Sequence, residues 1–244
     1  MRLALLLLFL AGCAGSDAPA EDARVLVFTK TEGWRHDSIP DAVEAVRQLG
    51  AAHGFAVDHT EDAAAFSDDR LADYAAVVFL LTSDDVLDAE QEAAFERYVR
   101  AGGGYAGVHS ASDTEYDWPF YGELVGAYFE SHPEVQLAAV DVVDGGHTST
   151  AHLPARWERT DEWYDFRQPP AGVRVLATLD ESTYEGGLMG DEHSIAWCHE
   201  KLGGRAWYTG GGHTSESYAD PAFREHLAGG IRYAAGLTDD DCGE

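Results

Sequence analysis

The chain has 244 residues, with 44 Asp and Glu against 16 Lys and Arg, which gives a formal net charge of -28. A nucleic-acid partner is not expected, because the protein would approach phosphates against its own electrostatic field. The composition is 45% hydrophobic and 11% aromatic, which excludes a disordered chain and is typical of a folded one with a core.

The N-terminus has the features of a secretory signal. A single Arg precedes the apolar run Leu3–Leu10, which is too short to cross a bilayer as a helix. The run leads into Leu-Ala-Gly-Cys at residues 10–13, which resembles the lipobox of bacterial lipoproteins. The resemblance implies that residues 1–12 are removed and that Cys13 is acylated, which makes the lipid bilayer a partner. The alternative is an ordinary signal peptide with a chance cysteine.

The mature chain is expected to have three parts. Residues 13–23 are rich in Ala, Gly, Ser, Pro and acid, a composition suited to a flexible spacer behind the acylated cysteine. A single domain is expected over residues 24–237, and a frayed acidic tail over residues 238–244. The predicted location is the cell envelope, after secretion across the inner membrane. In a Gram-negative cell the anchor would lie in the outer membrane or on a periplasmic face.

Two cysteines remain once Cys13 is acylated, and this number excludes a disulfide framework. Cys198 lies in the apolar run 195–198 and is interpreted as a small buried apolar residue. Cys242 lies in the polar tail. A bridge between the two stays an alternative in an oxidising compartment.

Strands and helices alternate in the first half of the domain. Continuous apolar runs predict strands, and a spacing of about 3.6 residues between apolar positions predicts helices. The strands are at residues 24–29, 55–59, 75–81 and 104–108, and the helices at residues 40–53 and 88–100. Asp88 with Gln91 three residues later is typical of a helix N-terminus. The alternation predicts a flavodoxin-like α/β fold, with a mostly parallel central sheet and helices on both faces.

The second half is less regular. Strands are expected at residues 135–143 and 173–179, a hairpin from residues 194–197 and 205–209, and a closing helix over residues 221–235. A linker rich in Pro and Ser is absent between the halves. We therefore expect one domain, in which antiparallel strands of the C-terminal half extend the parallel sheet.

The turn after the 104–108 strand is similar to a nucleophile elbow. Gly107 and Ala111 lie two residues before and after His109, and such an elbow tolerates only small neighbours around one exposed, reactive side chain. Because histidine occupies that point in place of Ser or Cys, the acyl-enzyme chemistry of a Cys-dependent glutamine amidotransferase is not expected. A histidine there would serve as base, acid, metal ligand or hydrogen-bond donor.

Other polar groups follow strands, where ligands gather in open α/β sheets. The segment 161–164 combines two acids with two aromatics, which suits recognition of a sugar by its hydroxyls and by its apolar face. The alternative for this segment is a strand or turn in which Trp163 belongs to the core and an acid pairs with a nearby arginine. The candidate ligand-binding residues are Lys30, Trp34, Arg35, His36, Ser110, Trp163, Tyr164 and His193.

The sequence has 11 histidines, and several lie in loops at strand ends. No pair has the close spacing of a zinc site on one helix. A divalent metal held by distant loops stays open, beside the alternative that the imidazoles bind sugar hydroxyls or each other. No cofactor is firmly implied.

Seven motifs in order resemble the trehalose-utilisation (ThuA-like) family over about residues 24–237. They lie at residues 30–36, 102–111, 121–126, 129–133, 161–164, 193–197 and 211–213. The resemblance implies a fold of the class I glutamine amidotransferase type, with His109 where relatives of that superfold carry Cys. It also implies a role in using trehalose or related disaccharides, including sugars oxidised at one ring hydroxyl. The Gly-Gly step before His147 and the loop 185–191 depart from the family pattern.

The leading hypothesis is an envelope lipoprotein that acts on or binds such a sugar. An enzyme of this kind would be a lyase or hydrolase that removes a proton beside a ring carbonyl. The expected catalytic residues are His109, His213, Asp161 and Glu162. The histidines would act as base and the acids as proton donor or hydroxyl anchor, while the cationic and imidazole groups of loop 30–36 would stabilise an oxyanion. The alternatives are a noncatalytic sugar-binding lipoprotein and a metal-dependent sugar hydrolase or lyase.

Acylation of Cys13 is directly testable. We expect the N-terminal peptide from the membrane fraction to begin at Cys13 and to carry the mass of attached lipid. Cys13→Ser should release the protein from membranes, because the acyl chains are the anchor. Mass spectrometry and fractionation check this expectation, and a soluble mature protein that begins at another residue would contradict it.

Overall fold

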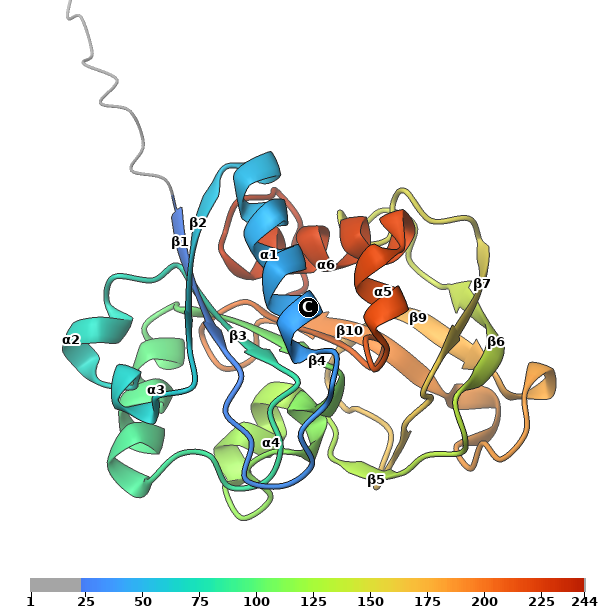
Figure 1. Cartoon of the computed structure of the whole chain (residues 1–244), viewed down its shortest axis with the longest axis horizontal. Helices are drawn as coiled ribbons and strands as arrows, with labels where there is room; N and C mark the ends of the chain where they lie inside the picture. Colours follow the sequence, from blue (N-terminus) through green and yellow to red (C-terminus); the bar gives the residue numbers. More distant parts are fainter. Residues whose placement is uncertain (1–22, 244) are drawn as a thin grey trace, which may run out of the picture.

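The computed structural model describes residues 23–243 (Figure 1). The expectations for residues 1–22, including the acylated Cys13, lie outside the described residues. Between residues 23 and 243 no helix combines the length and apolar character needed to cross a membrane.

A nine-stranded sheet forms the centre of the molecule, in the order β2-β1-β3-β4-β11-β10-β9-β6-β7. The strands from β2 to β11 in this order are parallel to their neighbours, and the pairs from β11 to β7 are antiparallel. The parallel part has the strand order of flavodoxin-like folds. The predicted fold class is therefore confirmed, including the antiparallel extension from the C-terminal half.

The parallel strands are close to their predicted positions. They are β1 (Ala23–Phe28), β2 (Phe55–Thr60), β3 (Ala76–Leu80), β4 (Gly104–Val108) and β11 (Ala206–Thr209). Every residue of β3 and β4 is buried, which explains why these segments are continuous runs of apolar and small residues without alternation. The carboxyl ends of all five strands meet at one edge of the sheet.

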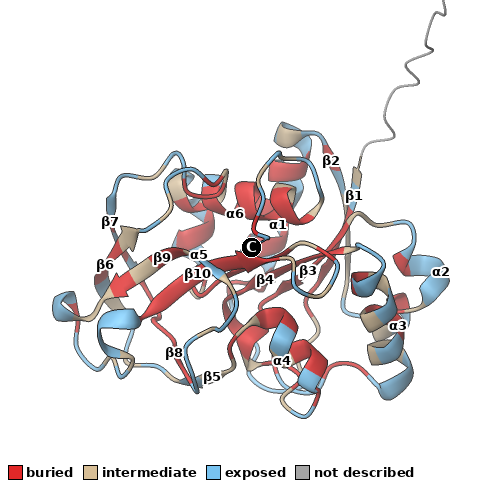
Figure 2. Cartoon of the chain, turned by 180° about the vertical axis from the view of Figure 1, so that it is seen from behind, coloured by how far each residue is buried: buried red, intermediate tan, exposed pale blue. Residues whose placement is uncertain are grey.

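Helices cover both faces of the sheet (Figures 1 and 2). One face carries α1 (Ile39–His53), α5 (Ser215–Ala219) and α6 (Pro221–Ala234), and the other carries α2 (Asp68–Leu71), α3 (Ala89–Arg100) and α4 (Pro119–Val125). Figure 2 shows the central strands and most of α6 as buried, whereas α2 and α3 carry exposed residues. The predicted start of α3 is confirmed, because Asp88 and Gln91 form a reciprocal capping box.

The antiparallel half contains a strand that the sequence did not indicate. Its strands are β6 (Gln136–Val142), β7 (Arg156–Asp161), β9 (Arg174–Asp180) and β10 (Ser194–His199), and a separate pair is formed by β5 (Phe129–Ser131) and β8 (Asp165–Phe166). In β7 every second residue is buried. Two of its three buried positions are Arg159 and Asp161, which pair with each other at 2.8 Å. The apolar alternation that would predict a strand is therefore missing.

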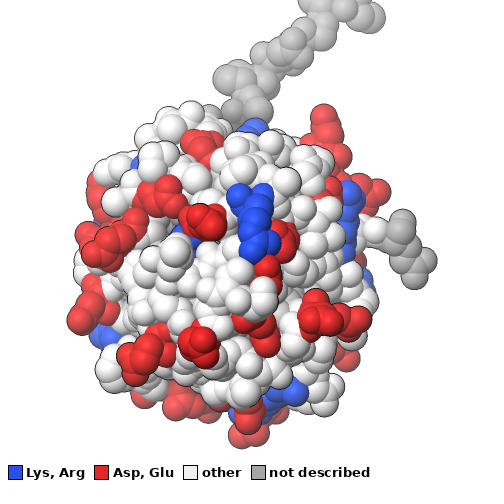
Figure 3. Space-filling view, turned by 90° about the vertical axis from the view of Figure 1, so that its right-hand side faces the viewer, with Lys and Arg blue, Asp and Glu red and all other residues white. Residues whose placement is uncertain are grey.

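Acidic side chains are spread over the face that Figure 3 presents, on the side of the molecule where β6 and β7 lie in Figure 1. Arg156 of β7 pairs here with Asp141 at 3.0 Å and with Asp180 at 2.7 Å. A polyanionic ligand would therefore meet mainly negative potential on this face.

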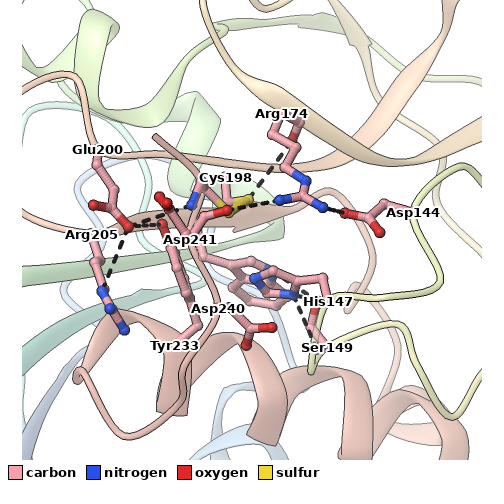
Figure 4. The surroundings of a disulfide bond; sticks show 12 residues. Asp144, His147, Ser149, Arg174, Cys198, Glu200, Arg205, Tyr233, Asp240 and Asp241 are labelled. Atoms are coloured by element: carbon pink, nitrogen blue, oxygen red, sulfur yellow. Dashed lines mark hydrogen bonds and ion pairs between the residues drawn. A yellow bond between two sulfur atoms is a disulfide. The ribbon is translucent and has the colours of Figure 1, made fainter. Parts of the chain in front are cut away.

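Cys198 and Cys242 form a disulfide (Figure 4), so the favoured interpretation of Cys198 as an unbonded core residue is wrong. Cys198 is fully buried as expected. The tail is also not frayed over its described residues, because Arg174 donates to the Asp241 carbonyl at 2.8 Å and Arg205 donates to the Thr238 carbonyl at 2.9 Å. Helix α6 leads the chain back to β10, so that Cys242 lies beside Cys198. This proximity depends on the tertiary structure and has no local signal in the sequence.

Loss of the disulfide should destabilise the protein. The bridge joins cysteines 44 residues apart, and removing a cross-link of this span costs about 2–4 kcal/mol, because the unfolded chain gains conformational freedom. We expect Cys242→Ser to lower the free energy of unfolding by that amount in denaturant titrations.

Reductant provides the matched control for this prediction. It should lower the stability of the wild type toward that of Cys242→Ser and should leave the variant unchanged. Equal stability of the wild type and the variant without reductant would contradict a disulfide in the folded protein.

Candidate active site

Strand β4 leads directly into His109 at the carboxyl edge of the sheet. The backbone φ of His109 is +51°, in the left-handed region that residues other than glycine rarely adopt. The short 3-10 helix η2 (His109–Asp113) begins at the same residue. The sequence predicts an exposed side chain at this turn, and that expectation is wrong. His109 is fully buried, because the Tyr164 ring packs against it with ring centroids 4.1 Å apart.

The orientation of the His109 ring is fixed by one hydrogen bond. Its Nδ1 lies 2.8 Å from the carbonyl oxygen of Gly210, and a carbonyl can only accept, so Nδ1 donates. In the neutral ring Nε2 then carries a lone pair. This nitrogen lies 3.3 Å from His213 Nδ1 and 3.3 Å from Glu162 Oε2.

Glu162 lies at the centre of the histidines. Its Oε2 is 3.0 Å from His213 Nδ1, and its Oε1 is 3.1 Å from His132 Nδ1. Burial raises the pKa of Glu162, but hydrogen bonds and positive charge from His109 and His213 in their protonated forms outweigh burial and hold the pKa well below its usual range. Glu162 is therefore a carboxylate at neutral pH.

His36 completes the cluster from the loop after β1. Its ring centroid lies 5.0 Å from that of His109 and 5.0 Å from that of His213. The residue is 4% exposed, and its Nδ1 is buried without a hydrogen-bond partner. Burial, and then the positive charges of His109 and His213 when protonated, lower the pKa of His36 to about 3. The ring is therefore neutral at neutral pH and can offer an unprotonated nitrogen.

Asp161 holds the turn that carries His213. Its Oδ2 accepts from the Gly212 N–H at 2.8 Å, and its Oδ1 accepts from the His213 N–H at 3.0 Å. It also pairs with Arg159 at 2.8 Å and accepts from the Ser217 hydroxyl at 3.2 Å. Because this fully buried carboxylate is occupied on both oxygens, we assign it a positioning role in place of the acid role expected from sequence.

Trp163 and His193 are structural residues next to the histidine cluster. Trp163 is buried, and its Nε1 donates to the Gln136 carbonyl at 2.9 Å, as in the alternative in which Trp163 is a core residue. His193 is also buried, and its Nε2 lies 2.8 Å from the Tyr164 carbonyl. The His193 contact fixes the backbone of Tyr164, and the ring of Tyr164 packs against His109.

The other residues expected to bind ligand do not contact the histidine cluster through their polar side-chain groups. Lys30 donates to a backbone carbonyl, and Arg35 pairs with Glu61 through two hydrogen bonds. The structure therefore gives both cations partners outside the histidine cluster. Trp34 is 71% exposed, and Ser110 is buried with its hydroxyl oxygen unpartnered.

His132 joins the site; the sequence places it among the loop histidines that could meet in space, but not among the expected catalytic or binding residues. It follows β5, and its Nδ1 lies 2.9 Å from the Pro133 carbonyl oxygen as well as 3.1 Å from Glu162 Oε1. Both partners only accept, so Nδ1 carries the proton and Nε2 of the neutral ring has a free lone pair. The side chain is 42% exposed. The sequence signal for this residue was the motif at residues 129–133, which alone did not indicate contact with Glu162.

The ThuA family model, described as trehalose utilisation, matches residues 24–234. The chain belongs to the ThuA family, and this membership supports a sugar-related role. No curated protein matches the chain significantly.

Solved structures show the same fold. A ThuA-like protein from Bacteroides uniformis has a TM-score of 0.76 at 22% identity and covers 95% of this chain and 98% of its own. A ThuA-like protein from Parabacteroides merdae has a TM-score of 0.74 at 20% identity, covering 92% of this chain and 96% of its own. The glutaminase domain of Trypanosoma brucei CTPS has a TM-score of 0.51 at 12% identity, covering 90% of this chain and 97% of its own. These similarities establish the fold alone.

Substitution of Asp161 should test its positioning role. Asp161→Asn removes the buried negative charge that faces Arg159, and loss of one partner from a buried ion pair costs about 3–5 kcal/mol. We expect the free energy of unfolding to fall by that amount in denaturant titrations.

The control for this prediction is Asp141→Asn. Asp141 pairs with Arg156 in an ion pair whose side chains are about half exposed, and such pairs contribute about 0–1 kcal/mol. Similar losses in the two variants would contradict the special role of Asp161.

Proposed function

We propose that this protein is a sugar lyase or hydrolase of the cell envelope, anchored through Cys13. Its substrate is an oxidised glycoside, which is a disaccharide of the trehalose type with a ketone on one ring. Family membership supports a sugar, and the pairing of His132 with Glu162 beside the buried histidines supports proton transfer.

The reaction begins at the carbon between the ketone and the anomeric carbon. A ketone acidifies the neighbouring C–H bond. Removal of this proton leaves an electron pair that forms a C=C bond to the anomeric carbon, while the anomeric C–O bond breaks. The departing oxygen takes up a proton, so the products are an unsaturated keto sugar and an alcohol. Addition of water to the double bond completes a net hydrolysis.

His132 is the base in this proposal, in place of the His109 or His213 expected from sequence. His109 is buried under Tyr164 and its Nδ1 is held by a backbone carbonyl, whereas Nε2 of His132 is free on a partly exposed ring. Glu162 Oε1 accepts a hydrogen bond from the Nδ1–H at 3.1 Å and stabilises the imidazolium that forms when Nε2 takes up the substrate proton. This dyad is the observation that carries the proposal.

His213 is assigned to the substrate ketone oxygen. Its side chain is 25% exposed, whereas those of His36 and His109 are buried. Burial lowers the pKa of His213, but the hydrogen bond and charge of Glu162 raise it above its ordinary value. A protonated His213 can therefore donate a hydrogen bond to the ketone oxygen on which negative charge develops.

Replacement of the proposed base gives the test. With a keto-disaccharide as substrate, His132→Gln should lower kcat about 10²–10⁴-fold, because the amide cannot take up the proton. KM should change little, and unoxidised trehalose should not react. Steady-state kinetics with a reducing-sugar readout measure both constants.

His53→Gln is the control, because His53 lies in α1 and faces Glu225 at a distance of 3.6 Å. It should retain wild-type kcat. Tight sugar binding without turnover by the wild type would show a binding protein. Full activity in His132→Gln would overturn the assignment of the base.

A further inference from the structure

Three ligand-type atoms of the site form a nearly equilateral triangle. The distances are 3.3 Å between His109 Nε2 and His213 Nδ1, 3.3 Å between His109 Nε2 and Glu162 Oε2, and 3.0 Å between His213 Nδ1 and Glu162 Oε2. A fourth side chain, His36, brings a ring nitrogen within 4.8 Å of all three atoms. Four potential metal-ligand atoms thus lie within 4.8 Å of one another. Three come from the ends of different strands, and the fourth comes from the loop after β1.

These separations match the geometry of metal coordination. Zinc binds imidazole nitrogen at about 2.0–2.1 Å, so the ligands of a tetrahedral ion lie about 3.3 Å apart. Adjacent ligands of an octahedral ion at a similar bond length lie about 3.0 Å apart. The triangle falls within this range.

The site also has more lone pairs than protons. His109 donates its one N–H to the Gly210 carbonyl, so its Nε2 can only accept in the neutral ring. Glu162 can also only accept. The buried Nδ1 of His36 has no hydrogen-bond partner among the described residues. The His213 Nδ1–H is the one donor shared by His109 and Glu162, so a cation would satisfy acceptors that hydrogen bonds leave open.

We propose that His36, His109, His213 and Glu162 bind one divalent transition-metal ion. Three imidazoles with one carboxylate and no thiolate favour Zn²⁺, Co²⁺, Ni²⁺ or Fe²⁺ over Mg²⁺ or Ca²⁺.

Hydrogen bonds around the four residues hold them in place, as is usual for the ligands of a metal site. Metal-bound histidines usually donate their second ring nitrogen to a fixed acceptor, as His109 does to Gly210. Asp161 fixes the backbone of His213. Glu162 divides its oxygens, with Oε2 toward the ion and Oε1 toward His132. His132 is therefore outside the ligand set and stays free as a base.

The proposed ion would lie next to the partly exposed side of the site, where a sugar could bind to it. His213 and His132 are the two partly exposed members of the site, so a ligand would reach the ion past these two side chains. The ketone oxygen and an adjacent hydroxyl of a sugar could occupy open positions there, and the ion would polarise the carbonyl as a Lewis acid. This role rests on the proposed function, whereas binding of the ion rests on the geometry alone.

Cobalt provides the direct test. Full-length protein without a histidine tag would be stripped of metal with chelator under non-reducing conditions, which keep Cys198 and Cys242 bonded. It would then be titrated with Co²⁺, with visible absorption and calorimetry as readouts. We expect one Co²⁺ per chain, with d–d bands that show nitrogen ligation.

Two variants and a control locate the ion. His36→Ala and Glu162→Gln should weaken Co²⁺ binding at least about 10-fold, and His53→Ala should bind as the wild type does. Circular dichroism would check that each variant is folded. Since Glu162→Gln retains the size of the side chain, it serves if His36→Ala does not fold.

Each outcome decides the proposal. Absence of Co²⁺ binding by the wild type, or wild-type affinity in both variants, would overturn the metal site. Binding of Co²⁺ at the four residues without turnover of the keto-disaccharide would uphold the site and reject the proposed function. Turnover that persists in metal-free protein would uphold the function and reject the role of the ion.

Discussion

The buried carboxylate of Asp161 is the constraint on which the site depends. It lies at the end of β7, the outermost strand of the antiparallel half, yet it accepts hydrogen bonds from Gly212 and His213 after β11. In a flat sheet β7 and β11 would be about 19 Å apart, since neighbouring strands are separated by about 4.8 Å. The contact therefore requires the antiparallel half to curl back over the carboxyl edge of the parallel half. The ion pair with Arg159 offsets the desolvation cost of burying the Asp161 carboxylate.

The curl of the sheet accounts for the origin of the site residues. His36, His109 and His213 come from loops after parallel strands, where any open α/β sheet offers a ligand site. Glu162 follows β7 and reaches the same edge because the sheet curls, whereas His132 follows β5 of the separate two-stranded pair. The carboxylate that organises the imidazoles is therefore supplied by an extension beyond the five parallel strands. The fold shared with the glutaminase domain accommodates this arrangement with a histidine at the elbow.

Much of the fold could be predicted from the sequence, and the exceptions have physical causes. Strands β3 and β4 and helix α3 have strong local signals in continuous apolar and small-residue runs and in the Asp88 capping box. Strand β7 has none, because its inward residues include a buried ion pair. The disulfide also has none, because a cysteine 44 residues away in a polar tail gives no indication of proximity.

The site could be predicted in part for similar reasons. Topology alone indicates that histidines after parallel strands lie at one edge. It does not indicate which side chain of the pair Asp161 and Glu162 points toward them, because adjacent residues at a strand end face opposite sides. The structure turns Asp161 into the interior and Glu162 toward the histidines. It likewise takes three-dimensional contacts to show that Tyr164 packs against His109 and that His132 reaches Glu162.

The direction of β1 places the start of the domain far from the histidine cluster. The described chain enters the sheet at Ala23, at the amino end of β1, while His109 lies at the carboxyl end of the parallel β4 (Figure 1). A strand of six residues spans about 20 Å, so the entry point and the histidine cluster lie at opposite edges of the sheet. The residues that precede Ala23 therefore join the domain at the edge opposite the histidine cluster, so that whatever they are attached to leaves the carboxyl edge of the sheet unobstructed.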